Sequence, residues 1–402
     1  MAILAVNAGS SSLKFSLHPL QRGQVQAHVL SGNVQGLEPG GTPSMDWEYE
    51  KQKHNEKLPP AGQGASSFVV ALERLGTLVQ SLQGVSITAV AHRVVHGGGV
   101  FTTSVLVTDE VLEQLARFNS LAPLHQPHNI EGIRRFRAAF PQLPQIACFD
   151  TAFHASMPEV NSAFALPRAL SEQGVRRYGF HGLSYQYVMS TLQTQTERSR
   201  GRVVMAHLGN GSSLCAAKGG LSVATTMGFS ALDGLMMGTR SGSIDAGVLL
   251  YLMEQGWTHD RIEKLLYKES GLLGVSGISA DMRKLRADGS EGAQRAIAQF
   301  TNRVVRDIGS MTASLDGLDL LAFSGGIGEN DTALREQVCA RLSWMGVRMD
   351  AQRNQQASGQ SAACAIHASD SPVQVWVVPT DEGRVAARET AALLRTKTAA
   401  IG

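Results

Sequence analysis

The sequence has few cysteines, little net charge and no long apolar run, and each of these absences excludes a class of protein. Only four cysteines occur among its 402 residues, with no CxxC or Cys/His spacing, which argues against a disulfide framework or a zinc site. With a formal net charge of +2, no strong field draws the chain to nucleic acid or to an anionic membrane. No segment approaches the roughly 18 consecutive apolar residues of a membrane span, and no basic signal-peptide region begins the chain. We therefore expect a soluble cytoplasmic protein that binds neither nucleic acid nor membrane.

Glycine, with 42 residues, is abundant, and short apolar segments alternate with helical patterns. Apolar runs predict buried strands at 3–6, 13–17, 87–91, 146–149, 203–206, 214–217, 320–323 and 375–378. Helical periodicity predicts helices over 67–82, 109–118, 129–140, 184–192, 245–253, 291–315 and 381–394. Asp109, Asn129 and Asp381 are expected as N-caps or first-turn residues, and the polar segment 32–64 as loops with one edge hairpin. This alternation indicates an α/β protein whose sheets are covered by helices.

The plan of the first residues recurs halfway along the chain. Residues 3–14 (ILAVNAGSSSLK) predict a strand, a Gly-Ser turn and a second strand, and residues 203–214 (VVMAHLGNGSSL) repeat this order. Chance is the alternative for so short a pattern. We interpret it as a duplication that gives two similar α/β domains, each opening on a strand–turn–strand hairpin.

Three glycine-rich turns are candidates for phosphate binding, because small residues let backbone N–H groups approach a phosphate closely. They are 7–12, 207–212 and 324–330, and the last lies between a predicted strand and a helix, where a nucleotide phosphate can bind. None has the GxxxxGK[ST] or Rossmann spacing. One such turn alone is more often an ordinary tight turn, but three in one chain favour nucleotide binding.

Charged side chains stand near these turns or at predicted strand ends. Lys14 could reach a phosphate as a point charge, and Arg93 and Arg240 could hold carboxylate or phosphoryl oxygens with paired hydrogen bonds. Asp150 and Asp381 follow predicted strands, where a carboxylate can bind Mg²⁺ or orient a nucleophile. The alternatives are a solvated lysine, structural salt bridges and, for Asp381, a helix cap.

His181 lies in a glycine-flanked turn, although a lone histidine is more often a core residue. No GxSxG motif with a catalytic triad is apparent. Phosphoryl transfer needs positive charge and alignment more than covalent catalysis, so the set of charged residues suits that reaction.

The motifs, in their order along the chain, resemble those of the acetate kinase family, within the larger group of acetate and sugar kinases, Hsp70 and actin. They are 7–15, 92–98, 122–125, 149–154, 178–184, 206–211, 234–242, 274–283, 325–330 and 380–382. The resemblance implies two duplicated ribonuclease-H-like domains of the actin-like ATPase fold around a central cleft. The N-terminal domain is expected over 1–150, completed by a C-terminal helix at about 384–402. The C-terminal domain, which binds the nucleotide, is expected over 151–383. It also implies a homodimer that reversibly transfers the γ-phosphoryl group of ATP to acetate, giving acetyl phosphate and ADP.

By the same resemblance, Asn7 and Glu382 correspond to Mg²⁺ positions, where Mn²⁺ is an alternative. Arg93 is similar to the ligand of the acetate carboxylate, and Asp150 to the catalytic carboxylate. Because acetate is ionised at pH 7, its attack on phosphorus needs no base. We therefore interpret Asp150 as orienting Arg93 or a Mg²⁺-bound water.

The remaining implied roles concern the phosphoryl group, the methyl group of acetate and the nucleotide. His181 and Arg240 resemble the groups that stabilise the transferring phosphoryl. The apolar wall around the methyl group corresponds to Val95, Leu124, Phe180 and Ala231. The nucleotide contacts correspond to Ser10, Ser12, Lys14, His207, Leu208, Gly209, Asn210, Gly211, Asp281, Met282, Arg283, Gly326, Ile327, Gly328, Glu329 and Asn330.

Several positions depart from the family pattern. The usual Gly-Asp-Ile-Asp-Pro reads GSIDA at 242–246, Phe-Thr-Pro-Leu-Glu-Gly reads FSALDG at 229–234, and His-Asn-Pro-Pro reads HQPH at 125–128. Tyr185 stands where a histidine usually follows Gly-Phe-His-Gly. No residue with an implied chemical role is lost, but the packing of the loop that carries Arg240, and with it the acyl specificity, is affected.

Two alternatives remain open from the sequence. A propionate or butyrate kinase differs from an acetate kinase by single methylene groups, which change discrimination by only about 1–3 kcal/mol. A non-enzymatic nucleotide switch of the same superfamily would not need Arg93, His181 and Arg240 together. Base preference, physiological direction and regulation are not predicted.

Overall fold

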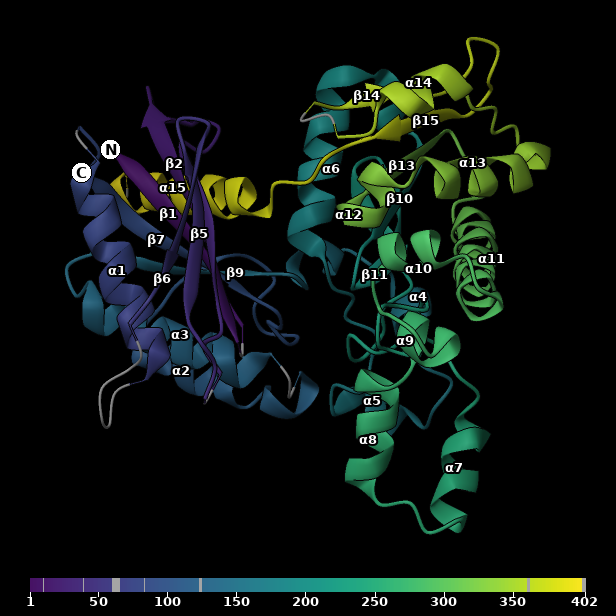
Figure 1. Ribbon diagram of the computed structural model, residues 1–402, viewed down its shortest axis with the longest axis horizontal. Coiled ribbons are helices and arrows are strands. Elements are labelled where there is room, and N and C mark those ends of the chain that lie inside the picture. The colour runs from purple at the N-terminus through teal and green to yellow at the C-terminus, as the bar shows by residue number, and fades with distance from the viewer. Residues whose placement is uncertain are drawn as a thin grey trace. The chain divides into compact units, whose positions relative to one another are not determined.

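The computed structural model describes residues 1–9, 11–38, 40–59, 66–82, 84–122, 125–359 and 362–399. The chain divides into two compact units, Met1–Ala152 with Asp381–Gly402 (unit 1) and Phe153–Thr380 (unit 2). Each unit is built on a mixed β-sheet with helices packed on it (Figure 1). The α/β class predicted from the alternation of strands and helices is confirmed.

The sheet of unit 1 is built outward from its first strand. Across the sheet the order is β6 (Gln52–Lys57), β5 (Ser44–Tyr49), β4 (Leu30–Gln35), β2 (Ser12–Gln21), β1 (Ala2–Ala8), β7 (Ile87–Val94), β9 (Gln145–Phe149) and β8 (Val105–Leu106), with β3 (Gln24–Val25) paired to β2. β1 runs antiparallel to β2 and parallel to β7, which is parallel to β9. The carboxyl ends of β1, β7 and β9 therefore lie at one edge of the sheet.

The sheet of unit 2 repeats this plan. Its order is β12 (Leu221–Thr225), β11 (Ser212–Lys218), β10 (Arg202–Leu208), β13 (Leu320–Ser324), β15 (Gln374–Val377) and β14 (Cys364–Ala365). β10 is antiparallel to β11 and parallel to β13, which is parallel to β15, and β14 closes the edge antiparallel, as β8 does in unit 1. The strand order and directions match those from β4 to β8, so the duplication predicted from the repeated hairpin is present in the fold.

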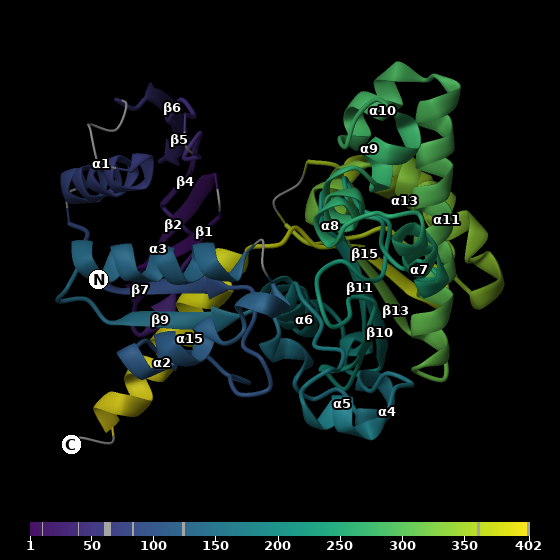
Figure 2. The same ribbon diagram turned by 90° about the horizontal axis from the view of Figure 1, so that it is seen from below.

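The helices of unit 1 cover both faces of its sheet. They are α1 (Ser67–Ser81), α2 (Asp109–Ala116), η1 (Asn119–Leu121), α3 (Gln126–Ala139) and α15 (Glu382–Ala399). Because side chains alternate along a strand, Leu4 of β1 shares a core with Phe136 of α3, whereas Ala5 lies beside Gly383 of α15. Figure 2 shows α3 and α15 on opposite sides of β7 and β9.

The helices of unit 2 are arranged in the same way. They are η2 (Ala152–His154, its first residue in unit 1), α4 (Glu159–Ser162), α5 (Arg168–Glu172), α6 (Gly182–Gln195), η3 (Glu197–Arg200), α7 (Ala246–Glu254), α8 (His259–Lys268), α9 (Gly271–Ser276), α10 (Met282–Asp288), α11 (Glu291–Ala313), α12 (Gly325–Asn330), α13 (Thr332–Arg341), η4 (Ser343–Met345) and α14 (Ala351–Gln356). Val204 of β10 shares a core with Phe300 of α11, and the next residue, Met205, shares a second core with Leu192 of α6. The sheet thus lies between α11 and α6.

Three local predictions are wrong, the first being the glycine-rich turn at 324–330, which forms the helix α12. Asn129 does not start a helix, because α3 begins three residues earlier and the Asn129 side chain is buried. Segment 32–64, of which residues 39 and 60–64 lie outside the described residues, contains most of the regular strand β4 in addition to the predicted hairpin, β5–β6, because Leu30 and Val34 bury one face of β4. Asp381 caps α15, since its Oδ1 accepts a hydrogen bond from Arg384 N at 2.9 Å.

The four cysteines are free thiols. In the part of the chain that the structure describes, no helix is both long enough and apolar enough to cross a bilayer.

Candidate active site

The first cluster of predicted site residues lies at the carboxyl edge of the unit 1 sheet. Arg93 is near the end of β7 and Asp150 directly follows β9, and both project to the face of the sheet that α15 covers, as their register with Cys148 requires. The guanidinium donates from Nε to Asp150 Oδ1 at 3.0 Å and from Nη2 to Oδ2 at 2.6 Å. The same Nε lies 3.4 Å from Glu382 Oε2 in the first turn of α15. Three residues far apart in sequence thus form one charged group.

This group is mostly removed from solvent. The Asp150 side chain is 2% exposed and that of Arg93 21%. Burial alone would lower the pKa of Arg93, but the charges of Asp150 and Glu382 outweigh it and raise the pKa above its ordinary value. Arg93 therefore remains a cation at any physiological pH, and the two carboxylates fix its direction.

A small pocket of about 130 Å³ brings further predicted residues to Arg93. Its lining includes Asn7, Lys14, Arg93 and Glu382. Asn7 of β1 and Lys14 of β2 are directly paired across the hairpin, so their side chains share a face. The pocket therefore holds two cationic groups beside an amide and a carboxylate, which are the ligand types that Mg²⁺ prefers.

Asn129 is a functional candidate that sequence reasoning missed. Its Oδ1 accepts a hydrogen bond from Val95 N at 3.0 Å, and its Nδ2 donates to Ala8 O at 2.7 Å. The side chain thus joins the residues after β7 to the end of β1, where the first glycine turn starts. The sequence around Asn129 gave no sign of this role, because only the fold places α3 beside both strand ends.

The second cluster lies in unit 2, around the turn between β10 and β11. The rings of His181 and His207 are stacked with centroids 4.2 Å apart. An ideal Cβ placed on Gly211 would lie 3.2 Å from both His181 Nε2 and Arg240 Nη2. His181, His207, Gly211 and Arg240 are therefore neighbours, and a side chain at position 211 would crowd the two groups expected to bind a phosphoryl group.

His181 is held in an unusual conformation. It precedes α6 with φ of 58°, a left-handed conformation that costs a non-glycine residue on the order of 1 kcal/mol and is often found at functional sites. Its Nδ1 is 2.9 Å from Ser213 Oγ, which is also 2.5 Å from the hydroxyl of Tyr185. Tyr185, one of the departures from the family pattern, therefore contacts His181 through Ser213. The spacing of four residues on one helix face could have suggested that Tyr185 and His181 are neighbours.

Arg240 is held by the loop that contains it. Its Nη1 donates to Ala231 O at 2.6 Å, and its own carbonyl accepts from Met237 N at 3.1 Å. Its guanidinium is thus tied to the residue that stands in place of the family's proline.

Two of the predicted nucleotide segments lie at or in short helices. Gly326–Asn330 forms most of the short helix α12, and Glu329 turns inward, where its Oε1 accepts from Gly325 N and Thr380 N at 2.8 and 3.1 Å. Burial raises the pKa of Glu329, although these two N–H groups partly oppose the shift. Asp281 caps α10 and pairs with Arg283 at 2.7 Å, which lowers its pKa to about 2.

The remaining predicted residues are divided between the two units and the core of unit 2. Met282 packs in the core of unit 2. Val95 lies in unit 1, whereas Phe180 and Ala231 lie in unit 2. Ser10 and Leu124 fall outside the residues that the structure describes.

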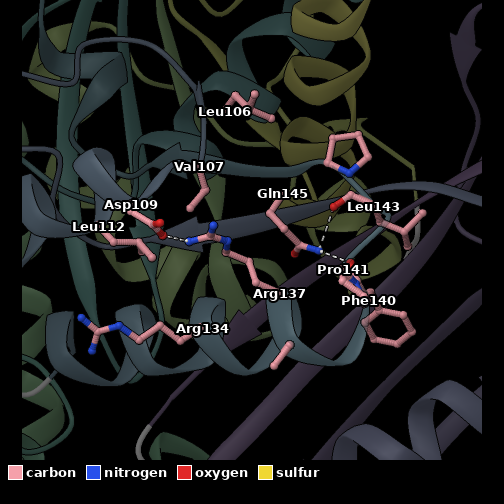
Figure 3. Close-up of a pocket in the computed structure, with 12 residues that line it drawn as sticks. Leu106, Val107, Asp109, Leu112, Arg134, Arg137, Phe140, Pro141, Leu143 and Gln145 are labelled. Atoms are coloured by element: carbon pink, nitrogen blue, oxygen red, sulfur yellow. Dashed lines mark hydrogen bonds and ion pairs between the residues drawn. The ribbon is translucent and has the colours of Figure 1, made fainter.

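A larger pocket in unit 1 does not contain any predicted site residue among those that the structure describes. It has a volume of about 520 Å³ and lies between α2, α3 and the start of β9, the end of that strand opposite to Asp150. Figure 3 shows Arg137 directed toward Asp109 and Gln145 bonded to the carbonyls of Phe140 and Leu143. Its size alone does not make it the reaction site, because the converging charges lie in the smaller pocket.

Known proteins resemble the chain over nearly its whole length. A sequence model of the acetokinase family matches residues 2–388. An acetate kinase of Rhodopseudomonas palustris is 48% identical over 392 residues, which cover 96% of this chain and 96% of that protein. The crystal structure of Porphyromonas gingivalis acetate kinase has a TM-score of 0.87 at 35% identity, covering 98% of this chain and 99% of that one. A propionate kinase from Francisella tularensis has the same TM-score at 36% identity, covering 96% and 98%. The chain has the two-domain actin-like ATPase fold of these kinases, and it belongs to the acetokinase family.

Proposed function

We propose that this protein is an acetate kinase, which reversibly transfers the γ-phosphoryl group of ATP to acetate. The observation that carries the proposal is the Arg93 cation, held by Asp150 and Glu382 in a pocket that Lys14 also lines. A carboxylate substrate and a nucleotide phosphate both need such a cation. We further propose that units 1 and 2 are the two ribonuclease-H-like domains expected from the sequence, and that the protein is cytoplasmic.

In this mechanism Arg93 binds the carboxylate of acetate and offsets its charge as it approaches the phosphorus. Acetate is already ionised, so no residue has to remove a proton. Asp150 holds the guanidinium in place through two hydrogen bonds, which leaves the other Arg93 donors for substrate. This gives the buried carboxylate an orienting role.

The donor set of unit 1 fits a divalent cation. Asn7 and Glu382 line the same pocket and offer an amide oxygen and a carboxylate, and we propose that they hold Mg²⁺, directly or through water, with Mn²⁺ as a substitute. When bound, the ion supplies neutralisation of the nucleotide phosphates. Lys14, paired with Asn7 across the hairpin, adds a second positive charge toward those phosphates.

Unit 2 supplies the groups that stabilise charge on the transferring phosphoryl. Arg240 and His181 both lie beside Gly211, and the backbone of the 207–211 turn is accessible because its glycines leave room. Charge on the equatorial oxygens increases in the transition state, so donors fixed before the reaction lower the barrier. The segments 281–283 and 326–330 of the same unit are proposed to bind the nucleotide.

The partner in solution is proposed to be a second copy of the chain. Helix α7 projects from the body of unit 2 (Figure 1), and its Leu250, Tyr251 and Met253 are 62%, 58% and 55% exposed. Exposed large apolar side chains gathered on one helix are typical of a protein–protein interface. A homodimer through α7 would cover it.

Propionate is the second candidate substrate, on the basis of Ala231. Alanine replaces a ring that commonly closes the acyl pocket in the family, and one buried methylene is worth about 0.8 kcal/mol. The similarity to the Francisella tularensis propionate kinase is compatible with this alternative.

The experiment is to measure initial rates of acyl phosphate formation from MgATP with formate, acetate, propionate and butyrate. The highest kcat/KM with acetate supports the proposal, and the highest with propionate supports the second candidate. ATP hydrolysis without any acyl phosphate would contradict both.

A further inference from the structure

The loop that carries Arg240 is closed at its neck by a polar cluster. We call residues 226–243 the Arg240 loop. The neck lies between the middle and the end of this loop, where Ser243 N donates to Gly234 O at 2.8 Å, and Gly234 N donates to Ser243 Oγ at 3.1 Å. Arg303 of α11 adds a hydrogen bond from Nη2 to Ser243 O at 2.9 Å.

Asp233 joins this neck to the segment before α6. Its Oδ1 accepts from Ser243 Oγ at 2.6 Å and from Gly234 N at 2.8 Å. Its Oδ2 accepts from Arg177 Nη1 at 3.0 Å, and the same nitrogen donates to Thr226 O at 2.8 Å. Both carboxylate oxygens are thus engaged, and the start, middle and end of the loop are tied to one side chain.

The backbone around this carboxylate has little room to adjust. An ideal Cβ on Gly228 would lie 2.6 Å from Asp233 Oδ2. Gly242, with φ of 69°, would place one 2.4 Å from Leu235 O. Glycine is required at both places, so the loop is packed closely against the carboxylate.

The cluster is connected to Arg240 through Ala231. The Arg240 guanidinium donates to Ala231 O at 2.6 Å, and Ala231 is only two residues before Asp233. A shift of Asp233 therefore moves the carbonyl that aims the guanidinium. Asp233 and Ser243 are also two of the positions at which this chain departs from the family pattern, so the hydrogen bond between them belongs to this chain's own residues.

We propose that Asp233, bonded to Arg177 and Ser243, is a positioning residue that fixes the direction of Arg240. The inference rests on the proposed function, because it assigns Arg240 to the transferring phosphoryl. The Asp233 and Arg177 side chains are 33% and 22% exposed, so solvent partly screens their ion pair. Misplacing a catalytic group by about 1 Å can cost on the order of 100-fold in rate. The cluster should therefore affect catalysis more than folding.

The test compares Asp233→Ala, Ser243→Ala and Ser243→Thr with the wild type. We expect kcat to fall about tenfold or more in Asp233→Ala and several-fold in Ser243→Ala, with KM for MgATP within about twofold. Ser243→Thr keeps the hydroxyl and should restore kcat. The variant that combines Asp233→Ala with Ser243→Ala should lose no more kcat than Asp233→Ala alone, because both changes remove the same hydrogen bond. Asp319→Ala is the matched control, since it removes another partly buried ion pair of unit 2, with Arg202 at 2.7 Å.

Two results would overturn the proposal. One is an unchanged kcat in Asp233→Ala. The other is that the control variant, with an equally lowered thermal midpoint, loses as much kcat as Asp233→Ala. A wild type with no acyl kinase activity would instead contradict the proposed function, so the two failures are distinguishable.

Discussion

Replacing Asp150 with asparagine should lower activity much more than an equivalent change elsewhere in the chain. Asparagine has nearly the same shape but no charge, and its amide nitrogen cannot accept a hydrogen bond. One of the two hydrogen bonds from Arg93, at 3.0 and 2.6 Å, is therefore lost. Arg93 is then attracted mainly by Glu382, whose Oε2 lies 3.4 Å from Arg93 Nε.

The magnitude follows from the value of one hydrogen bond to a charged group. Such a bond contributes about 1.5–3 kcal/mol. Because each 1.36 kcal/mol in the barrier is a factor of ten, a loss of this size in the transition state lowers kcat about 10- to 150-fold. The closer contact between Arg93 and Glu382 should also raise KM for MgATP, since Glu382 is a proposed metal ligand.

The assay is steady-state acetyl phosphate formation, with urea unfolding measured on the same samples. Asp319→Asn is the matched control, because Asp319 forms the same kind of paired contact with Arg202, at 3.0 and 2.7 Å, within unit 2. Both variants should lose some free energy of unfolding, but only Asp150→Asn should lose activity. A kcat within twofold of wild type in Asp150→Asn, or an equal loss in the control, would refute the reasoning.

Three further predictions concern acid stability, acyl specificity and nucleotide binding. Burial lowers the pKa of His18, His92 and His154 from 6.5 to about 4, so the unfolded chain binds more protons than the folded chain between these values. The free energy of unfolding should therefore fall as the pH is lowered from about 6.5 toward 4, on the order of 3 kcal/mol per histidine, and a flat urea midpoint over this range would contradict it. Ala231→Pro should lower the propionate-to-acetate ratio of kcat/KM by about fourfold, as expected for one methylene, and an unchanged or higher ratio would show that this position does not set the depth of the pocket. MgATP should change both small-angle scattering and hydrogen exchange, because the proposed reaction uses groups from both units, and no change in either would contradict a hinged enzyme.

The regular elements could be predicted because their patterns are local. In β10, Val204 faces α11 and Met205 faces α6, so both faces of the strand are buried. The sequence shows this as a short continuous apolar run. The failure at Asn129 has a physical reason: an asparagine near a helix start is usually a cap, and only tertiary structure gives this one Val95 N and Ala8 O as partners.

The positions of single candidate residues could be predicted, but the contacts between them could not. Arg93 and Asp150 each follow an apolar strand, so both could be placed at strand ends, yet their pairing depends on β7 and β9 being parallel neighbours in a particular register. The link from Tyr185 through Ser213 to His181 depends on where α6 packs on the sheet. Such contacts are determined by the fold as a whole, and no short pattern encodes them.

The most direct measurement of the central claim is ³¹P NMR of wild type, Arg93→Ala and Arg240→Ala with MgATP and acetate. Phosphoryl transfer to acetate predicts that the wild type forms acetyl phosphate and ADP in equal amounts. It also predicts that the wild type forms ATP from acetyl phosphate and MgADP in the reverse reaction. Each variant should remain folded and lose roughly 10²–10³-fold in rate, as expected when a stabilising group of the transition state is removed. Formation of ADP and inorganic phosphate alone, or full activity in either variant, would contradict the account.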